Sequence, residues 1–140
     1  MKRRFSIILF LVICAVTGII FSVYGENSEE EKCREFLLSY GWEVGEKSDS
    51  HADVTIPAVF DKVYENYNEI QKSSGLDLLP YCGKNGTRYT FIVTNYPIDV
   101  GETVYANVII INGEPVGGDI MTVSLSGFMH GLGENIPTSY

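Results

Sequence analysis

Hydrophobic positions along the chain follow three successive patterns. An uncharged apolar run covers residues 5–24, apolar residues then recur every three or four positions, and alternation with polar residues follows after Gly75. Spacings of three and four are typical of an amphipathic helix, whereas alternation is typical of a half-buried strand. We therefore expect a membrane or export segment, then helices, and then strands.

Residues 5–24 predict a helix that crosses or enters a membrane. Twenty residues of helix span about 30 Å, the thickness of the hydrocarbon core of a bilayer. The basic residues 2–4 precede the run and Glu26 follows it, so the N-terminus is expected in the cytoplasm and the rest of the chain outside. We favour an uncleaved anchor because the run is longer than the core of a usual signal peptide. A signal segment cleaved near Gly25, giving a secreted protein, is the alternative.

Two helices are predicted in the exported part. The first covers residues 28–40, where Ser28 and Glu31 form a capping-box pattern. The second covers residues 57–74, with Pro57 in its first turn and Gly75 at its end. The apolar side expected for the second helix consists of Phe60, Val63, Tyr64, Tyr67 and Ile70. Asn68 is expected among the polar residues of the other side.

Two hairpins are predicted after these helices. Asn85-Gly86 and Asn112-Gly113 are residue pairs that favour two-residue turns. Strands are expected at 76–83 and 87–95 around the first pair, and at 103–111 and 114–125 around the second. The second turn would place Pro115 opposite Ile110, at a point where the sheet has an edge. Gly117-Gly118 suggests a bulge or a close backbone approach.

The order of elements predicts an α+β fold, in which helices pack on one face of a mainly four-stranded antiparallel sheet. Short strands at 42–44 and 54–56 and a surface loop at 45–52 complete the prediction. We divide the chain into a membrane or signal segment (1–25), the juxtamembrane start of the first helix (26–34), an extracytoplasmic domain (35–132) and a C-terminal tail (133–140). A composition with 45% hydrophobic residues is sufficient for one small packed domain.

The charge balance argues against a nucleic-acid partner. The chain has a formal charge of −8, and three of its ten basic residues lie at positions 2–4. The part after Gly25 therefore has seven basic and 18 acidic residues, a net charge of −11. Such a domain is repelled by nucleic acid and by anionic lipid surfaces.

Several short motifs together resemble one known family. They include Gly41-Trp42-Glu43-Val44, Gly75-Leu76-Asp77-Leu78, Arg88-Tyr89-Thr90, Gly117-Gly118-Asp119-Ile120 and Gly127-Phe128-Met129-His130-Gly131-Leu132. Over roughly residues 35–132 the chain is similar to the bacterial family known as domain of unknown function 4830. The resemblance implies a small domain behind a membrane or export segment. It brings no activity, cofactor or catalytic residue.

Three kinds of candidate site remain. Cys33 and Cys82 are the cysteines outside the apolar run, and an oxidising compartment would allow them to form a disulfide. Cys82, His130 and Asp119 have the residue types of a thiol hydrolase, although no local motif supports that role. With two histidines in the chain and no paired ligand spacing, no metal site and no cofactor is predicted.

Tyrosines supply the candidate binding residues. Most of them are expected to complete the core, but Tyr64, Tyr96 and Tyr105 would form a contact patch if they cluster on the surface. The hypothesis that follows is a non-catalytic, membrane-anchored module that binds or regulates an envelope protein or a cell-wall component. The alternatives are a small hydrolase that depends on Cys82 or His130, and an inhibitor-like module that resembles cystatins at the level of fold alone.

Overall fold

The computed structural model describes residues 28–134, and the predicted membrane segment at 5–24 lies outside this range. Among the described helices, none has both the length and the apolar character needed to cross a bilayer. The elements are α2 (Glu29–Ser39), β1 (Ser50–Thr55), α3 (Lys62–Ser73), the short 3-10 helix η1 (Leu79–Tyr81), β2 (Asn85–Ile92), β3 (Tyr105–Ile111), β4 (Glu114–Met121) and β5 (Met129–Gly131). Within residues 28–134 the strands form one antiparallel sheet in the order β1-β2-β3-β4-β5. The α+β class is confirmed, and the sheet has five strands instead of four.

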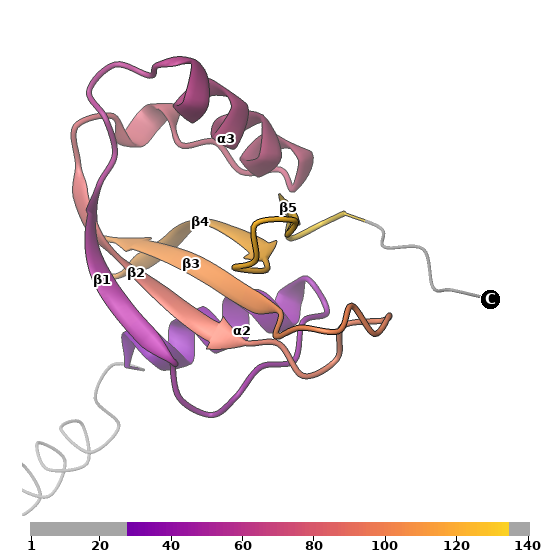
Figure 1. Ribbon diagram of the computed structural model, residues 1–140. Coiled ribbons are helices and arrows are strands. Elements are labelled where there is room, and N and C mark those ends of the chain that lie inside the picture. Colours follow the sequence, from indigo (N-terminus) through magenta and orange to yellow (C-terminus); the bar gives the residue numbers. More distant parts are fainter. Residues whose placement is uncertain (1–27, 135–140) are drawn as a thin grey trace, which may run out of the picture.

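The two helices lie on opposite faces of the sheet, so the prediction that they share one face is wrong. Figure 1 shows α3 above the sheet and α2 below it. Along β3, Val108 and Ile110 belong to the hydrophobic cluster on the α2 side, whereas Ile109 and Ile111 belong to the cluster on the α3 side. A continuous apolar run such as residues 108–111 is typical of a strand that is covered on both faces.

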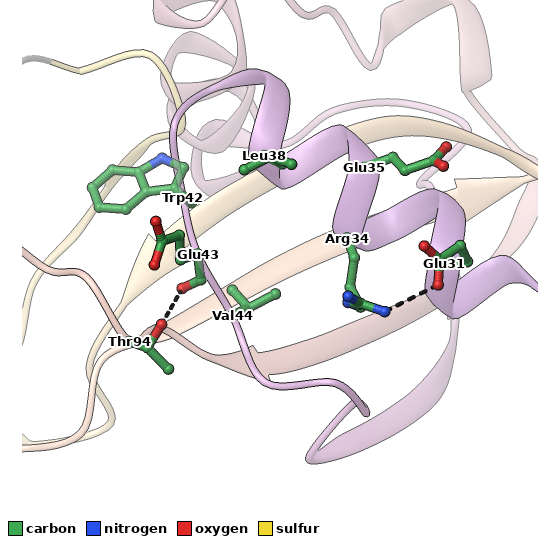
Figure 2. Close-up of a pocket in the computed structure, with 8 residues that line it drawn as sticks. All are labelled: Glu31, Arg34, Glu35, Leu38, Trp42, Glu43, Val44 and Thr94. Atoms are coloured by element: carbon green, nitrogen blue, oxygen red, sulfur yellow. Dashed lines mark hydrogen bonds and ion pairs between the residues drawn. The ribbon is translucent and has the colours of Figure 1, made fainter.

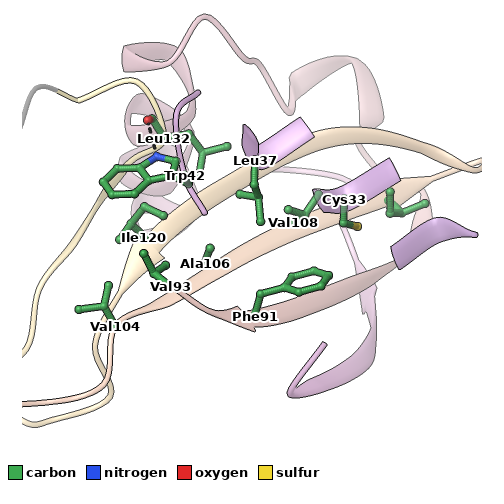
Figure 3. Close-up of a cluster of buried hydrophobic side chains, with 11 residues drawn as sticks. Cys33, Leu37, Trp42, Phe91, Val93, Val104, Ala106, Val108, Ile120 and Leu132 are labelled. Atoms are coloured by element: carbon green, nitrogen blue, oxygen red, sulfur yellow. Dashed lines mark hydrogen bonds between the residues drawn. The ribbon is translucent and has the colours of Figure 1, made fainter. Parts of the chain in front are cut away.

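The cluster on the α2 side is the larger core. Cys33 and Leu37 of α2 pack on Phe91 of β2 and on inward-facing residues of β3 and β4 (Figure 3). Trp42 follows the helix and closes one end, with its indole Nε1 donating to the Leu132 carbonyl at 2.8 Å. Ser28 caps α2 by accepting from the Glu31 N–H at 3.3 Å, as the sequence predicts.

Helix α3 begins later than predicted, and its buried side agrees with the prediction only in part: Tyr64 and Tyr67 pack on the α3-side cluster as expected. The Asp61 carboxylate accepts from the Tyr64 N–H at 2.8 Å, so the helix starts at Lys62 and not at Pro57. Asn68 and Gln71 are buried as well, whereas Val63 of the predicted side is exposed. The reason lies in the loop that follows the helix: Asn68 Oδ1 accepts from the Leu78 N–H, and its Nδ2 donates to Asp77. These tertiary hydrogen bonds outweigh the apolar pattern.

The second hairpin is confirmed. Asn112 and Gly113 both have positive φ angles, 53° and 76°, and join β3 to β4. Pro115 lies opposite Ile110, and the register shifts between Ile109 and Ile110, which is the bulge expected near Gly117-Gly118. Strand β5 pairs with residues 119–121 of β4, so in the described sheet the proline end of β4 has a strand, β3, on one side only. Strand β4 ends at Met121 instead of continuing to 125.

The prediction of the first hairpin, around Asn85-Gly86, is wrong. Residues 76–83 contain η1 instead of a strand, because side-chain oxygens of Asn68 and Asp77 accept from the Leu78 and Leu79 N–H groups. Asn85-Gly86 lies inside β2 and pairs with residues 54–55 of β1. A Cβ atom at Gly86 would lie 2.3 Å from the Ile110 carbonyl oxygen, so this glycine allows a close backbone approach.

Two further segments differ from the prediction. The loop expected at 45–52 contains the start of β1, which replaces the short strand expected at 54–56. The strand expected at 42–44 is reduced to a single bridge between Val44 and Val93. Both segments pair with β2 or its continuation, so long-range pairing decided their conformation.

Candidate functional site

A polar row crosses the sheet on the same face as α3. Ser50 pairs with Thr90, Thr90 with Asn107, and Asn107 with Asp119, so that one residue from each of β1 to β4 contributes. Paired residues in neighbouring strands point to the same face of a sheet. Part of this face is left open as a groove of about 310 Å³. The residues that line the groove are Asp49, Ser50, Arg88, Thr90, Tyr105, Asn107, Met121 and Val123.

Hydrogen bonds connect the floor of the groove to the interior. The Thr90 hydroxyl donates to Asn107 Oδ1 at 2.7 Å, and Asn107 Nδ2 donates to Asp119 Oδ1 at 2.8 Å. The Tyr67 hydroxyl of α3 donates to the other Asp119 oxygen at 2.8 Å. The chain from Tyr67 to Thr90 therefore holds two groove residues, Asn107 and Thr90, in fixed orientations.

Asp119 is the buried carboxyl group of this network, with 2% of its surface exposed. Burial raises the pKa of Asp119, because the charged form loses its hydration, while the hydrogen bonds from Asn107 and Tyr67 act in the opposite direction. Burial and the neighbouring Asp119 likewise raise the pKa of Tyr67. Burial thus shifts the acidity of both groups toward the protonated form, and both serve as hydrogen-bonding parts of the fold.

The groove also contains charged groups without partners. Neither the Arg88 guanidinium nor the Asp49 carboxylate makes a side-chain hydrogen bond or an ion pair within residues 28–134. Arg88 does act on Asp119 and Tyr67 electrostatically, lowering the pKa of each against the effect of burial. An unpaired arginine beside fixed polar side chains is suited to hold a polar ligand.

In two other grooves the cationic side chains are already paired. One, of about 290 Å³, lies between α2 and residues 42–44, and its Arg34 is bonded to Glu31 at 3.0 Å (Figure 2). The other, of about 490 Å³, lies along α3, where Lys72 pairs with Glu69 and Lys62 with Glu65. We therefore regard the sheet groove as the candidate site.

The structure separates the three residues of the hydrolase hypothesis. Asp119 faces α3, whereas His130 lies on the other side of the sheet, stacked on Phe128 and hydrogen-bonded to Tyr96. Cys82 directly follows η1, in the short connection that leads to β2. Across residues 28–134, no three histidine, cysteine, aspartate or glutamate side chains gather as metal ligands.

The two cysteines of the predicted disulfide are free thiols in the structure. Cys33 is fully buried in the α2-side core, and Cys82 is partly exposed at the other side. Burial, together with Glu29 and Glu30, raises the pKa of Cys33 to about 12. This thiol therefore behaves as a small apolar side chain.

The three candidate tyrosines lie in three different places. Tyr64 packs between Phe60 and Tyr67 in tilted and edge-on contacts, Tyr96 stacks between Trp42 and Phe128, and Tyr105 lines the groove. They do not form one patch. Sequence reasoning did not select Arg88, Thr90 and Asn107, although polar residues alternating with apolar ones along residues 87–95 were the available signal.

The structure defines this chain as a small α+β domain, with a five-stranded antiparallel sheet between two helices and an open polar groove. It belongs to the family described as domain of unknown function DUF4830, whose model matches residues 36–120. This match confirms the resemblance drawn from the short motifs. The matched range contains all of the groove residues except Met121 and Val123. No curated protein and no solved structure matches the chain.

Proposed function

We propose that this protein is a membrane-tethered binding or regulatory module of the bacterial cell envelope, and that it acts without catalysis. The observation that carries the binding role is the sheet groove, whose polar side chains are held by the buried Asp119 network. Its lining residues include no cysteine or histidine. The groove therefore offers hydrogen bonds and charge, which suit recognition better than nucleophilic attack.

The proposed location is supported by the pattern at the start of the chain. The uncharged run at 5–24 follows three basic residues, and α2 begins only a few positions later, at Glu29. The net charge of −11 after Gly25 repels anionic lipid headgroups. A tether would therefore hold the domain near the membrane while the groove stays available to soluble or wall-bound ligands.

Site-specific photo-crosslinking in living cells tests the binding role. A photoreactive phenylalanine derivative replaces Tyr105, which lines the groove, and in a matched control it replaces Glu46, which lies in the α2–β1 loop. We expect a crosslinked product from position 105 that is absent from position 46, and that is unchanged in a Cys82→Ala background. Equal products from both positions would contradict the proposal. Loss of the product in folded Cys82→Ala chain would favour the hydrolase alternative.

Protease added to intact cells tests the location. We expect external protease to degrade the domain, and the mass of the mature chain to include residues 1–25. A mature chain that begins near Gly25 would mean a secreted form of the same module. Protection of the domain in intact cells, with degradation only after lysis, would remove the extracytoplasmic placement.

A further inference from the structure

We infer that the sheet groove binds a short zwitterionic peptide, with its carboxylate on Arg88 and its amino group on the oxygen atoms of Asp49 and Thr90. This inference rests on the proposed function and gives its ligand a chemical class. The argument comes from the hydrogen-bonding capacity that the groove residues have left after their internal bonds are made.

One corner of the groove is rich in acceptors, beside the Ser50 hydroxyl, which can donate or accept. Thr90 donates its single hydroxyl proton to Asn107 Oδ1 at 2.7 Å, so its oxygen offers lone pairs to a ligand. Asp49 lies beside it, because the Asp49 N–H donates to the Thr90 carbonyl at 2.8 Å. An ionised carboxylate is also an acceptor. Both residues line the groove, and two acceptor groups at one corner, one of them charged, fit an ammonium group.

The other end of the groove presents donors. Arg88 lies two residues before Thr90 on the same face of β2, so their backbone positions are roughly 7 Å apart along the strand. Its guanidinium is a donor only, has no partner within residues 28–134, and matches a carboxylate through two parallel hydrogen bonds. A dipeptide in extended form spans about 7 Å, which is comparable to this backbone separation, so one charged end can face Arg88 while the other faces Asp49 and Thr90.

Charge and size restrict the ligand further. A domain with a net charge of −11 repels an anion, whereas a zwitterion is neutral overall and meets no such long-range penalty. The groove volume of about 310 Å³ is at the lower end of the range for small-molecule sites. Met121 and Val123 form its apolar wall, so an apolar peptide side chain has a place to pack.

Calorimetric titration of the full-length chain in nanodiscs tests the inference. The probes are alanyl-leucine, its N-acetyl form and its C-terminal amide. We expect the free dipeptide to bind, and each blocked form to bind about tenfold or more weakly, since each block removes one charged hydrogen-bonding end. Equal affinity for the free and blocked forms, or failure of the free dipeptide to bind, would overturn it.

Matched variants assign each end of the ligand. Arg88→Gln should weaken binding of the free dipeptide about tenfold or more and leave binding of the amide unchanged, because the amide has no carboxylate. Asp49→Asn should also weaken binding of the free dipeptide about tenfold or more, and it should leave binding of the N-acetyl form unchanged, because that form has no charged amino group. Lys84→Gln and Asp99→Asn are exposed controls away from the groove and should have no effect. A variant that weakens all three probes equally would contradict the assignment.

The outcome also separates this inference from the proposed function. If the dipeptide fails to bind but position 105 still captures a specific product in cells, the ligand class is wrong and the binding module stands. If both experiments fail, both proposals fall.

Discussion

Replacing Asp119 by asparagine removes the buried carboxyl group of β4 while keeping the size and shape of the side chain. The carboxyl is 2% exposed and accepts hydrogen bonds from Asn107 and Tyr67. An asparagine can keep one oxygen toward Asn107 and turn its amide toward the Tyr67 hydroxyl, which also accepts hydrogen bonds. We therefore expect the Asp119→Asn chain to fold, with a stability that differs from that of the natural chain in a pH-dependent way.

The sign of this dependence follows from burial. Because burial raises the pKa of Asp119 in the folded chain, the folded state holds the proton more tightly than the unfolded state does. Relative to Asp119→Asn, the natural chain is most stable below about pH 4, the usual aspartate value. The natural chain loses this advantage as the pH rises through the pKa that Asp119 has in the folded chain. Above that pKa, the difference in stability between the two chains is constant. Each tenfold difference in acidity between the two states corresponds to about 1.4 kcal/mol.

Fluorescence of Trp42 provides the assay. Trp42 is the one tryptophan of the sequence, is buried, and donates to the Leu132 carbonyl, so its emission changes on unfolding. Melting temperatures of both full-length chains are compared in the same mild detergent between about pH 4 and 8. The other carboxylates are common to both chains, so their titration cancels in the difference.

Two results would refute the reasoning. A difference that is independent of pH would mean that Asp119 does not change its acidity on folding. If the stability of the natural chain relative to the variant instead increases as the pH rises, the hydrogen bonds from Tyr67 and Asn107 lower the pKa of Asp119 by more than burial raises it.

Three further predictions concern the same packing. Tyr67→Phe leaves one oxygen of Asp119 without its donor and should lower the free energy of unfolding by about 1–3 kcal/mol. In the same melts, the control Tyr64→Phe, whose ring packs on Phe60, should change the free energy of unfolding by less than about 0.5 kcal/mol. Gly118→Ala places a Cβ atom 2.6 Å from the Asn107 carbonyl oxygen and should cost about 1–3 kcal/mol, while Gly45→Ala, with its nearest atom at 3.6 Å, is the near-neutral control. Alkylation of the folded chain, followed by mass spectrometry of its peptides, should label Cys82 and spare Cys33, which is buried and has its pKa raised to about 12. Equal labelling of the two would show that the α2-side core is open.

Local chemistry was sufficient for some elements. Ser28 caps α2 because its hydroxyl lies within one turn of the N–H groups that it satisfies. Asn112-Gly113 makes a hairpin because both residues adopt positive φ, and Pro115 then takes its place opposite Ile110. These interactions join residues that are a few positions apart.

The same type of signal failed where distant residues compete. Asn85-Gly86 has the composition of a turn, yet Gly86 lies in β2 where the Ile110 carbonyl leaves no room for a Cβ atom. Asn68 has the pattern of an exposed position, yet it is buried because it bonds to the Leu78 N–H and to Asp77. Such hydrogen bonds arise only after the chain has folded back on α3.

Residue order alone was enough to predict an α+β domain, its first helix, its β3–β4 hairpin and its family, since each of these depends on short-range pattern. The assignment of the two helices to opposite faces, and the alignment of Ser50, Thr90, Asn107 and Asp119 in one row, came from the tertiary structure. The groove combines residues from four strands, and strand register is set by which side chains pack together across the whole sheet. A pattern read along one strand at a time does not contain that information.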